Sequence, residues 1–315
     1  MSDEKIPQRV LRPGQSARIR IWERATRTVR TVFESRDRLY EAPNWTTDGQ
    51  LLVNGDGRLW LLPADGPADG PADGSAPPRQ IPVTGLPDVN NDHVLAPDGV
   101  TVFASANDWH IWEAPLAGGA ARRVTVEDGG MHFLHGVSPD GRRLGYVRLE
   151  PEGDNWWASA TIHTVGLDGQ DDVAVTTDPG PADGCEWTPE GEWIVFNTEQ
   201  FSTAPGHAQL ARVRPDGTGL EQLTFDERVN WFPHVAPTGD VAVYLSYPPG
   251  TTGHPADLPV ELRLVSVDAW QEPETLVALH GGQGTINVPS WAPDGSAFAF
   301  VDYPTGSRND LENPA

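Results

Sequence analysis

The sequence has few of the residues that would suit it to a disulfide-stabilised or nucleic-acid-binding role. Its 315 residues include one cysteine, Cys185, which excludes an intramolecular disulfide and any cysteine-rich zinc site. Lysine and arginine total 22 against 45 aspartates and glutamates, so the formal net charge is −23. That charge repels nucleic-acid phosphates and anionic lipid surfaces, and we expect neither nucleic acid nor a membrane as a partner.

Long apolar runs are also missing. No stretch approaches the roughly 18 apolar residues of a membrane-spanning helix. The first twenty residues contain no apolar run of signal-peptide length. We therefore expect a soluble, cytoplasmic protein.

Uninterrupted helical segments are scarce as well. The chain has 33 glycines and 30 prolines, one residue in five, which leaves little room for the long amphipathic helices of α/β folds. Short apolar or alternating runs lie between these residues, for example Leu51–Val53, Val100–Ala104 and Val241–Leu245. Many short strands bounded by turn residues predict an all-β fold.

An internal repeat defines the architecture. Six segments share an apolar or aromatic residue, a four-residue turn that ends in glycine, and a following apolar run. They are Trp45-Thr-Thr-Asp-Gly49, Leu95-Ala-Pro-Asp-Gly99, Val137-Ser-Pro-Asp-Gly141, Trp187-Thr-Pro-Glu-Gly191, Val235-Ala-Pro-Thr-Gly239 and Trp291-Ala-Pro-Asp-Gly295. Proline presets φ at the second turn position, and glycine accepts the positive φ that closes a tight hairpin. Successive turn glycines are 42 to 56 residues apart, close to the length of a four-stranded propeller blade.

The two ends of the chain complement each other. The last unit has one clear strand, Ala297–Tyr303, whereas Ala17–Glu23 and Arg27–Glu34 are two strands without a blade. We predict a six-bladed β-propeller of four-stranded blades, in which the N-terminal strands complete the last blade and close the ring. A single domain would cover residues 1–315, with polar tails at 1–16 and 304–315. The Pro-Ala-Asp-Gly repeat at 63–74 is typical of a solvated loop.

From Ala17 to Tyr303, these repeats resemble the TolB-like, WD40-like propeller family, whose repeat is roughly Trp-Ser-Pro-Asp-Gly before an apolar strand. Segments such as Asn230–His234 and Gly281–Asn287 look like those of a cytoplasmic TolB-like subgroup. Related propellers act as Pal-binding periplasmic proteins, as lids of prolyl oligopeptidases and as oligogalacturonate lyases. The resemblance implies the fold rather than one of these activities. No Gly-x-Ser-x-Gly nucleophile elbow occurs in the chain.

Polar residues gather where the innermost strands of a propeller converge on its axis. When the repeats are aligned on the turn glycine, His93, His135, His234 and Glu186 come from four blades and enter the same central mouth. Imidazoles are suitable ligands for a divalent metal, and the oligogalacturonate lyases that the repeat resembles place histidines from different blades on one metal. We therefore predict a metal site formed by His93, His135 and His234, with manganese, zinc or calcium as the cofactor.

A metal at that mouth would support a lyase or hydrolase acting on an acidic sugar, because the ion neutralises a carboxylate and eases proton abstraction beside it. Glu186 or His132 would be the catalytic base. The predicted substrate-binding residues are Asn230, Trp231, Asn287, Asp183, Asn91 and Glu41. A small molecule or carbohydrate would be the ligand, although the negative field of the protein disfavours an acidic polymer.

The sequence is compatible with two alternatives. The histidines could instead hydrogen-bond loop backbone and stack between blades. The repeat fold alone also supports a non-catalytic scaffold that binds a protein partner. Trp45, Trp187 and Trp291 share one repeat position and are expected to pack between neighbouring blades.

Overall fold

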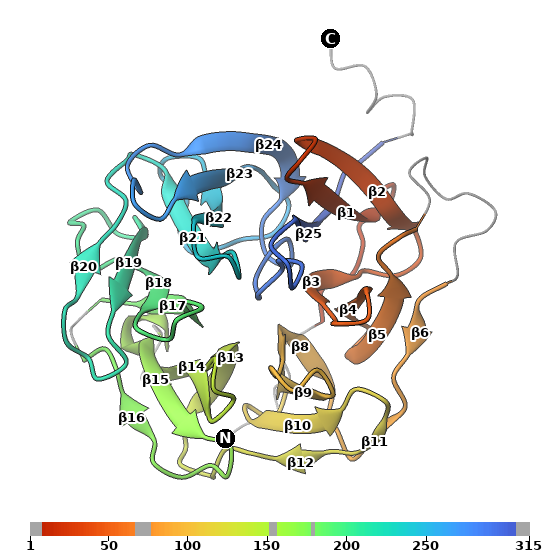
Figure 1. Ribbon diagram of the computed structural model, residues 1–315, viewed down its shortest axis with the longest axis horizontal. Helices are drawn as coiled ribbons and strands as arrows, with labels where there is room; N and C mark the ends of the chain where they lie inside the picture. The colour runs from red at the N-terminus through yellow and green to blue at the C-terminus, as the bar shows by residue number, and fades with distance from the viewer. Residues whose placement is uncertain (1–7, 67–76, 151–155, 178–179, 307–315) are drawn as a thin grey trace.

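Six β-sheets are arranged as the blades of a propeller around a central axis (Figure 1). The computed structural model describes residues 8–66, 77–150, 156–177 and 180–306. Most of the Pro-Ala-Asp-Gly repeat and the end of the predicted C-terminal tail lie outside the described residues. The described helix is the short 3-10 helix η1 (Trp156–Ser159). In the part of the chain that is described, no helix is long and apolar enough to cross a membrane.

The first three blades follow one another along the chain, each an antiparallel sheet with its first strand innermost. Blade one consists of β3 (Glu41–Trp45), β4 (Gln50–Gly55), β5 (Arg58–Pro63) and β6 (Arg79–Gln80). Blade two consists of β8 (Val89–Leu95), β9 (Thr101–Ala106), β10 (Ile111–Pro115) and β12 (Arg122–Arg123). Between them, β7 (Val83–Thr84) pairs in parallel with β11 (Gly119–Ala120). Blade three consists of β13 (Met131–Val137), β14 (Arg143–Leu149), β15 (Thr161–Gly166) and β16 (Val173–Ala174).

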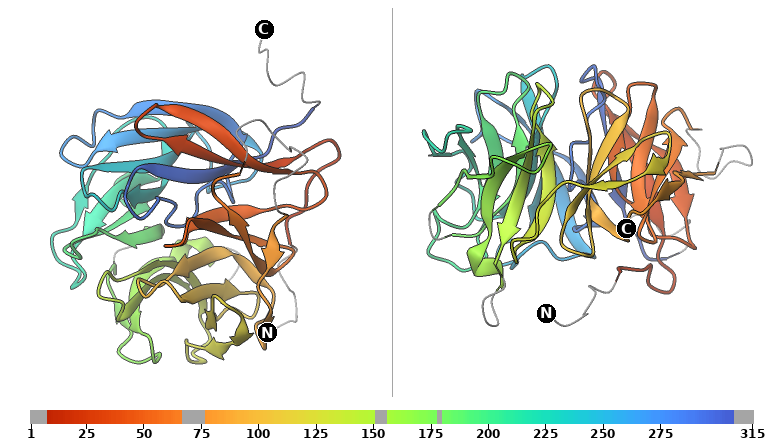
Figure 2. Two further views of the ribbon diagram at one scale, coloured as in Figure 1. Left: turned by 45° about the vertical axis from the view of Figure 1, so that its right-hand side comes forward. Right: turned by 90° about the horizontal axis from the view of Figure 1, so that it is seen from below.

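The next two blades repeat this order. Blade four consists of β17 (Ala182–Trp187), β18 (Ile194–Thr198), β19 (Gln209–Val213) and β20 (Glu221–Gln222). Blade five consists of β21 (Val229–Val235), β22 (Val241–Tyr247), β23 (Leu258–Ser266) and β24 (Glu274–Gly281). The side view shows the strands running between the two faces of the ring (Figure 2).

The sixth blade joins the two ends of the chain. Its strand order is β2 (Thr28–Ser35), β1 (Ala17–Glu23) and β25 (Ala297–Asp302), with β1 antiparallel to β25. The innermost place is taken by an irregular segment, residues 285–291, whose Trp291 forms an isolated bridge with Phe298. The prediction that the N-terminal strands complete the last blade is confirmed.

The six repeated turns have the geometry that their residues predict. In each turn the glycine amide donates to the carbonyl three residues earlier, at 2.8 to 3.3 Å. The φ angles of the six glycines lie between 69° and 78°. A residue with a side chain is strained in this left-handed region, whereas glycine is not. These local turns therefore fix the start of the second strand of every blade.

The apolar core is divided among the contacts between blades. Six buried clusters occur in the described residues, one between each neighbouring pair of blades. The repeat tryptophans take part in these contacts as expected. The indole of Trp187 lies so close to Gly145 of blade three that a Cβ there would be 2.6 Å from Cζ3. The Nε1–H of Trp291 donates to the carbonyl of His234 in blade five at 3.0 Å.

A bulge interrupts the innermost strand of the first five blades, between Glu41 and Asn44 in the first blade and at corresponding places in the others. At this place Ala42, Gly184 and Phe232 have positive φ. A bulge sets two residues of one strand opposite a single residue of its partner. Side chains on either side of it therefore do not alternate regularly, and their directions depend on the folded ring.

Candidate functional site

The three histidines predicted as metal ligands hold the irregular segment 285–291 in the centre of the ring. Nε2 of His234 donates to the carbonyl of Ile286 at 2.6 Å, and Nδ1 of His135 donates to the carbonyl of Asn287 at 3.2 Å. His93 acts indirectly. Its Nδ1 lies 2.9 Å from Oδ1 of Asn44, whose Nδ2 donates to the carbonyl of Pro289 at 2.7 Å. Because carbonyl oxygens only accept, each of these directions is fixed.

The second nitrogen of His135 and of His234 is also engaged. Nε2 of His135 lies 2.8 Å from Oδ1 of Asp183, and Nδ1 of His234 contacts Oε2 of Glu186. Nε2 of His93 is buried without a hydrogen-bond partner in the described residues. Burial lowers the pKa of His93 to about 3, so this imidazole stays neutral.

The predicted metal centre is therefore corrected. An imidazole ligates a metal through a nitrogen lone pair, and the nitrogens of His135 and His234 instead bond carbonyls and carboxylates. Among the described residues, no group of three or more His, Cys, Asp or Glu side chains is placed to hold a metal ion. The residues do not fit the manganese, zinc or calcium site that the sequence predicts. The histidines instead bond backbone, as the alternative interpretation holds.

The two candidate catalytic bases do not share a site. His132 lies between blades two and three, where its Nδ1 is 2.8 Å from the carbonyl of Trp109 and its ring stacks on His110. Burial lowers the pKa of His132. Glu186 reaches the end of the axis where the repeated turns lie. We therefore derive no step in which either residue removes a proton from a metal-bound substrate.

Charged groups in the centre of the ring shift one another's pKa. Burial alone lowers the pKa of His135, but the carboxylates of Asp183 and Asp92 outweigh it and raise that pKa to about 9. Burial raises the pKa of Asp92 to about 7, partly offset by His135. Burial opposes ionisation of Asp183 too, yet His135 and His254 hold its pKa below the usual range. In the centre, Asp183 and Asp92 therefore favour the protonated form of His135, and the pKa values of these two acids are shifted in opposite directions.

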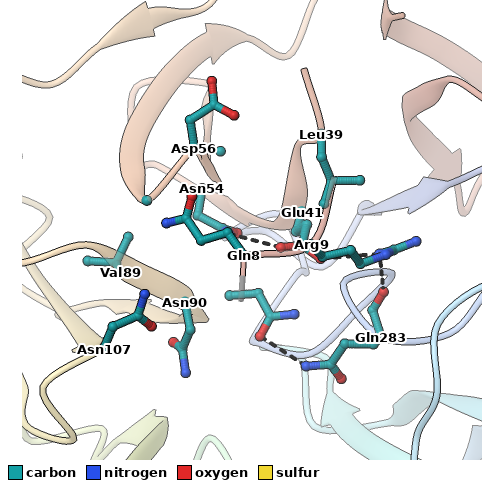
Figure 3. A pocket seen from close by; sticks show the side chains of 13 residues that line it. Gln8, Arg9, Leu39, Glu41, Asn54, Asp56, Val89, Asn90, Asn107 and Gln283 are labelled. Carbon is teal, nitrogen blue, oxygen red and sulfur yellow. Dashed lines mark hydrogen bonds and ion pairs between the residues drawn. The ribbon is translucent and has the colours of Figure 1, made fainter. Parts of the chain in front are cut away.

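A polar pocket opens at the end of the axis where the innermost strands begin (Figure 3). Its volume is about 190 Å³. Six carboxamides line what we call the amide pocket: Gln8, Asn54, Asn90, Asn91, Asn107 and Gln283. Figure 3 shows Asn90 and Asn107 on one side, and Arg9 and Gln283 on the other. The side chains come from blades one and two, the N-terminal segment and the loop after β24.

Paired charges form one wall of the amide pocket. Nη1 of Arg9 donates to Glu41 at 3.2 Å, and its Nη2 donates to Asp257 at 2.8 Å. Its guanidinium lies 4.0 Å from the ring centre of Tyr303. Burial raises the pKa of Glu41 despite the nearby positive charge of Arg9. In the described part of the predicted N-terminal tail, Leu11, Gln15 and Ser16 pack against the ring, whereas Gln8 and Arg9 line the pocket.

The predicted substrate-binding residues divide into three groups. Glu41 and Asn91 line the amide pocket. Asn287 lies behind it and donates to Gln283 at 3.1 Å, and Asp183 pairs with His135 deeper in the ring.

Asn230 and Trp231 are fully buried elsewhere in the core. Asn230 accepts a hydrogen bond from Ser246 at 2.7 Å. Trp231 packs against Trp157 and His254, so its ring is covered and cannot stack on a sugar at a mouth. Both predictions are corrected, because the bulge in β21 makes the direction of these side chains depend on the folded ring.

Sequence reasoning missed Arg9, Gln8, Asn54 and Asn107 as lining residues. They lie outside the innermost strands, and repeat alignment therefore does not select them. Gln283 belongs to the glycine-rich segment Gly281–Asn287, so its conspicuous local composition was a usable signal.

The fold, the repeated turns and the closure by the N-terminal strands define a six-bladed, TolB-like β-propeller. The uncharacterized protein Atu1656 of Agrobacterium fabrum is 35% identical over 299 residues, which cover 92% of this chain and 94% of that protein. The chain belongs to the same family. The structure that is named as a putative TolB from Agrobacterium tumefaciens has 34% identity and a TM-score of 0.81, with 93% of this chain and 99% of that chain covered.

More distant structures share the fold alone. An oligogalacturonate lyase in complex with manganese has a TM-score of 0.56 at 15% identity, with 81% of this chain and 68% of that chain covered. No protein-family model matches the chain.

Proposed function

We propose that the protein binds a small, uncharged, polyhydroxylated molecule, such as a single sugar unit, in the amide pocket. The observation that carries this proposal is the concentration of six carboxamides around one pocket. A carboxamide both donates and accepts hydrogen bonds, and neighbouring hydroxyls do the same. Asn and Gln side chains therefore complement a sugar better than they complement an ion or a hydrocarbon.

The charges of the pocket favour an uncharged ligand. Arg9 is paired with Glu41 and Asp257, and Asp56 is paired with Arg38. A charged ligand would have to displace one of these partners and leave the other partly desolvated. A neutral ligand needs only the amide groups.

The size of the pocket favours a small ligand. Its volume of about 190 Å³ lies below the 300–1,000 Å³ typical of sites for drug-sized molecules. The arrangement supports binding rather than a reaction. Glu41 is the acid buried in its wall, and the other acid that lines it, Asp56, is exposed and paired with Arg38.

The test is a binding screen of uncharged monosaccharides and polyols by ligand-observed NMR, followed by calorimetry of those that bind. Asn107→Ala removes a half-buried lining amide, and we expect it to weaken binding of a ligand from this screen by about 3- to 30-fold, because one or two hydrogen bonds are lost.

Gln80→Ala is the matched control, since it removes an exposed amide of blade one outside the pocket. The affinity of this variant for the same ligand should equal that of the wild type. Equal weakening by both variants, or no uncharged ligand in the screen, would contradict the proposal. In that outcome a protein partner on the surface of the ring becomes the better hypothesis, and recovery of that partner should be unaffected by Asn107→Ala.

A further inference from the structure

A second pocket lies at the opposite end of the axis from the amide pocket. It has a volume of about 440 Å³ and is lined by the ends of the innermost strands and by the repeated turns. We call it the turn-end vestibule. Its volume falls within the range of pockets that hold small organic molecules. None of its lining residues belongs to the amide pocket.

The walls of the vestibule are mostly apolar and aromatic, and Asn44, Thr46 and Thr47 are the uncharged polar residues among them. The three repeat tryptophans, Trp45, Trp187 and Trp291, all line it. Five of the six repeated turns also contribute their proline, for example Pro97 and Pro237. Indole rings attract cations through their negative faces. Prolines add apolar contact and have no N–H group to donate.

One ionisable group lies among the described residues that line the vestibule, the carboxyl of Glu186. Its side chain is 12% exposed, and its partner in the core is His234. Burial raises the pKa of Glu186, although the nearby His234 counteracts this effect. A cation in the vestibule would give this poorly hydrated carboxylate a second partner and so favour its charged form.

We propose that the turn-end vestibule binds a small organic cation, an ammonium group carried on an apolar or aromatic body. Glu186 would pair with the ammonium group, and the tryptophans and prolines would surround the apolar body. The overall charge of −23 raises the local concentration of cations near the protein. An anionic ligand is disfavoured by both the local carboxylate and this field.

The experiment uses three probes of similar shape: 2-phenylethylammonium, the uncharged 2-phenylethanol and the anionic phenylacetate. Dissociation constants are measured by calorimetry with the whole protein, and saturation-transfer NMR identifies the protons in contact. We expect the ammonium probe to bind at least tenfold more tightly than the alcohol, and phenylacetate to bind least.

Glu186→Gln should reduce the preference for the ammonium probe over the alcohol to less than about threefold. Glu190→Gln is the matched control, because it removes the same charge from the exposed turn of the same blade, outside the vestibule. The preference of Glu190→Gln for the ammonium probe over the alcohol should remain that of the wild type. If the two variants lose the preference equally, the cation responds only to the general negative field and the proposal is overturned.

A second variant covers the case in which Glu186→Gln disturbs folding through His234. Pro237 is exposed in a turn that lines the vestibule, so Pro237→Arg adds a positive charge there without altering the core. We expect the ammonium probe to bind at least tenfold more weakly to this variant, with the alcohol changed less than twofold. Unchanged binding of the ammonium probe, or equal affinity of the wild type for ammonium and alcohol, would also overturn the proposal.

Discussion

Asp92 is a buried carboxyl group whose environment opposes its negative charge. It is 5% exposed and accepts a hydrogen bond from Nδ2 of Asn90 at 2.8 Å. Burial, together with the charge of Asp183, raises its pKa to about 7, and His135 limits the rise. The native protein therefore holds this proton at pH values where the unfolded chain has lost it, which makes stability depend on pH.

The sign of this dependence gives the first residue-scale prediction. As pH rises from about 4 to about 7, the unfolded chain releases the Asp92 proton first, so the free energy of unfolding falls. His135 adds stability that is complete below about 6.5 and is lost as pH rises through about 9. Asp92→Asn abolishes the titration of residue 92. It also weakens the stabilisation by His135, because the charge of Asp92 is one of the causes that raise the pKa of this imidazole. The free energy of unfolding of the variant minus that of the wild type should therefore be about 1–4 kcal/mol higher at pH 8 than at pH 5.

Urea unfolding at pH 5 and pH 8 measures this difference. Asp37→Asn is the control, because it removes an exposed aspartate from the loop that connects blade six to blade one. Its effect should be the same at both pH values. If the effect of Asp92→Asn is also the same at both pH values, the pKa of Asp92 is not raised in the native ring.

At the scale of secondary structure, closure of the ring depends on the pairing of β1 with β25. Arg18 lies opposite Asp302 in this pair and donates to it twice, at 2.8 and 2.6 Å. Arg20 donates to the same carboxylate at 3.0 Å. The side chain of Asp302 is 3% exposed, so one buried acid joins two arginines of the N-terminal strand to the C-terminal strand.

Asp302→Ala should lower the free energy of unfolding by about 2–4 kcal/mol, since it leaves two partly buried guanidinium groups without their partner. Asp240→Ala is the matched control. It removes the exposed partner of Arg24, and exposed pairs contribute less than about 1 kcal/mol. Chemical denaturation of both variants gives the comparison. Similar losses for the two would mean that the buried carboxylate does not join the ends of the ring.

At the scale of the whole molecule, the excess of negative charge opposes the compact ring. With a net charge of −23, carboxylates on neighbouring blades repel one another across the surface. Added salt shortens the distance over which exposed charges interact, from about 30 Å at 0.01 M to about 8 Å at 0.15 M. Buried pairs such as Arg18 with Asp302 are screened far less.

We therefore expect the melting temperature to rise by a few degrees when sodium chloride is increased from about 0.01 to about 0.15 M. Differential scanning calorimetry provides the measurement, and potassium chloride at the same concentrations tests for a specific effect of sodium. A fall in melting temperature would mean that surface ion pairs, such as Arg58 with Asp88, stabilise the ring more than repulsion destabilises it.

The sequence by itself determined the ring. The six turns recur because proline, a short polar residue and glycine have local backbone preferences that act wherever the chain places them. The unmatched strands at the two ends then predict closure, and the tryptophans at one repeat position predict packing between blades. These features depend on neighbours in the sequence or on a fixed repeat.

Only the tertiary structure decided what the polar residues do. His135 and His234 have the residue type of metal ligands. Each instead donates a hydrogen bond to a carbonyl of residues 285–291, the irregular segment that takes the innermost place in the sixth blade. Arg9 and Gln283 are separated by 274 positions, and nothing local indicates that they meet. Side-chain direction after a bulge, and the distances between blades, result from packing the whole ring, so no local pattern could supply them.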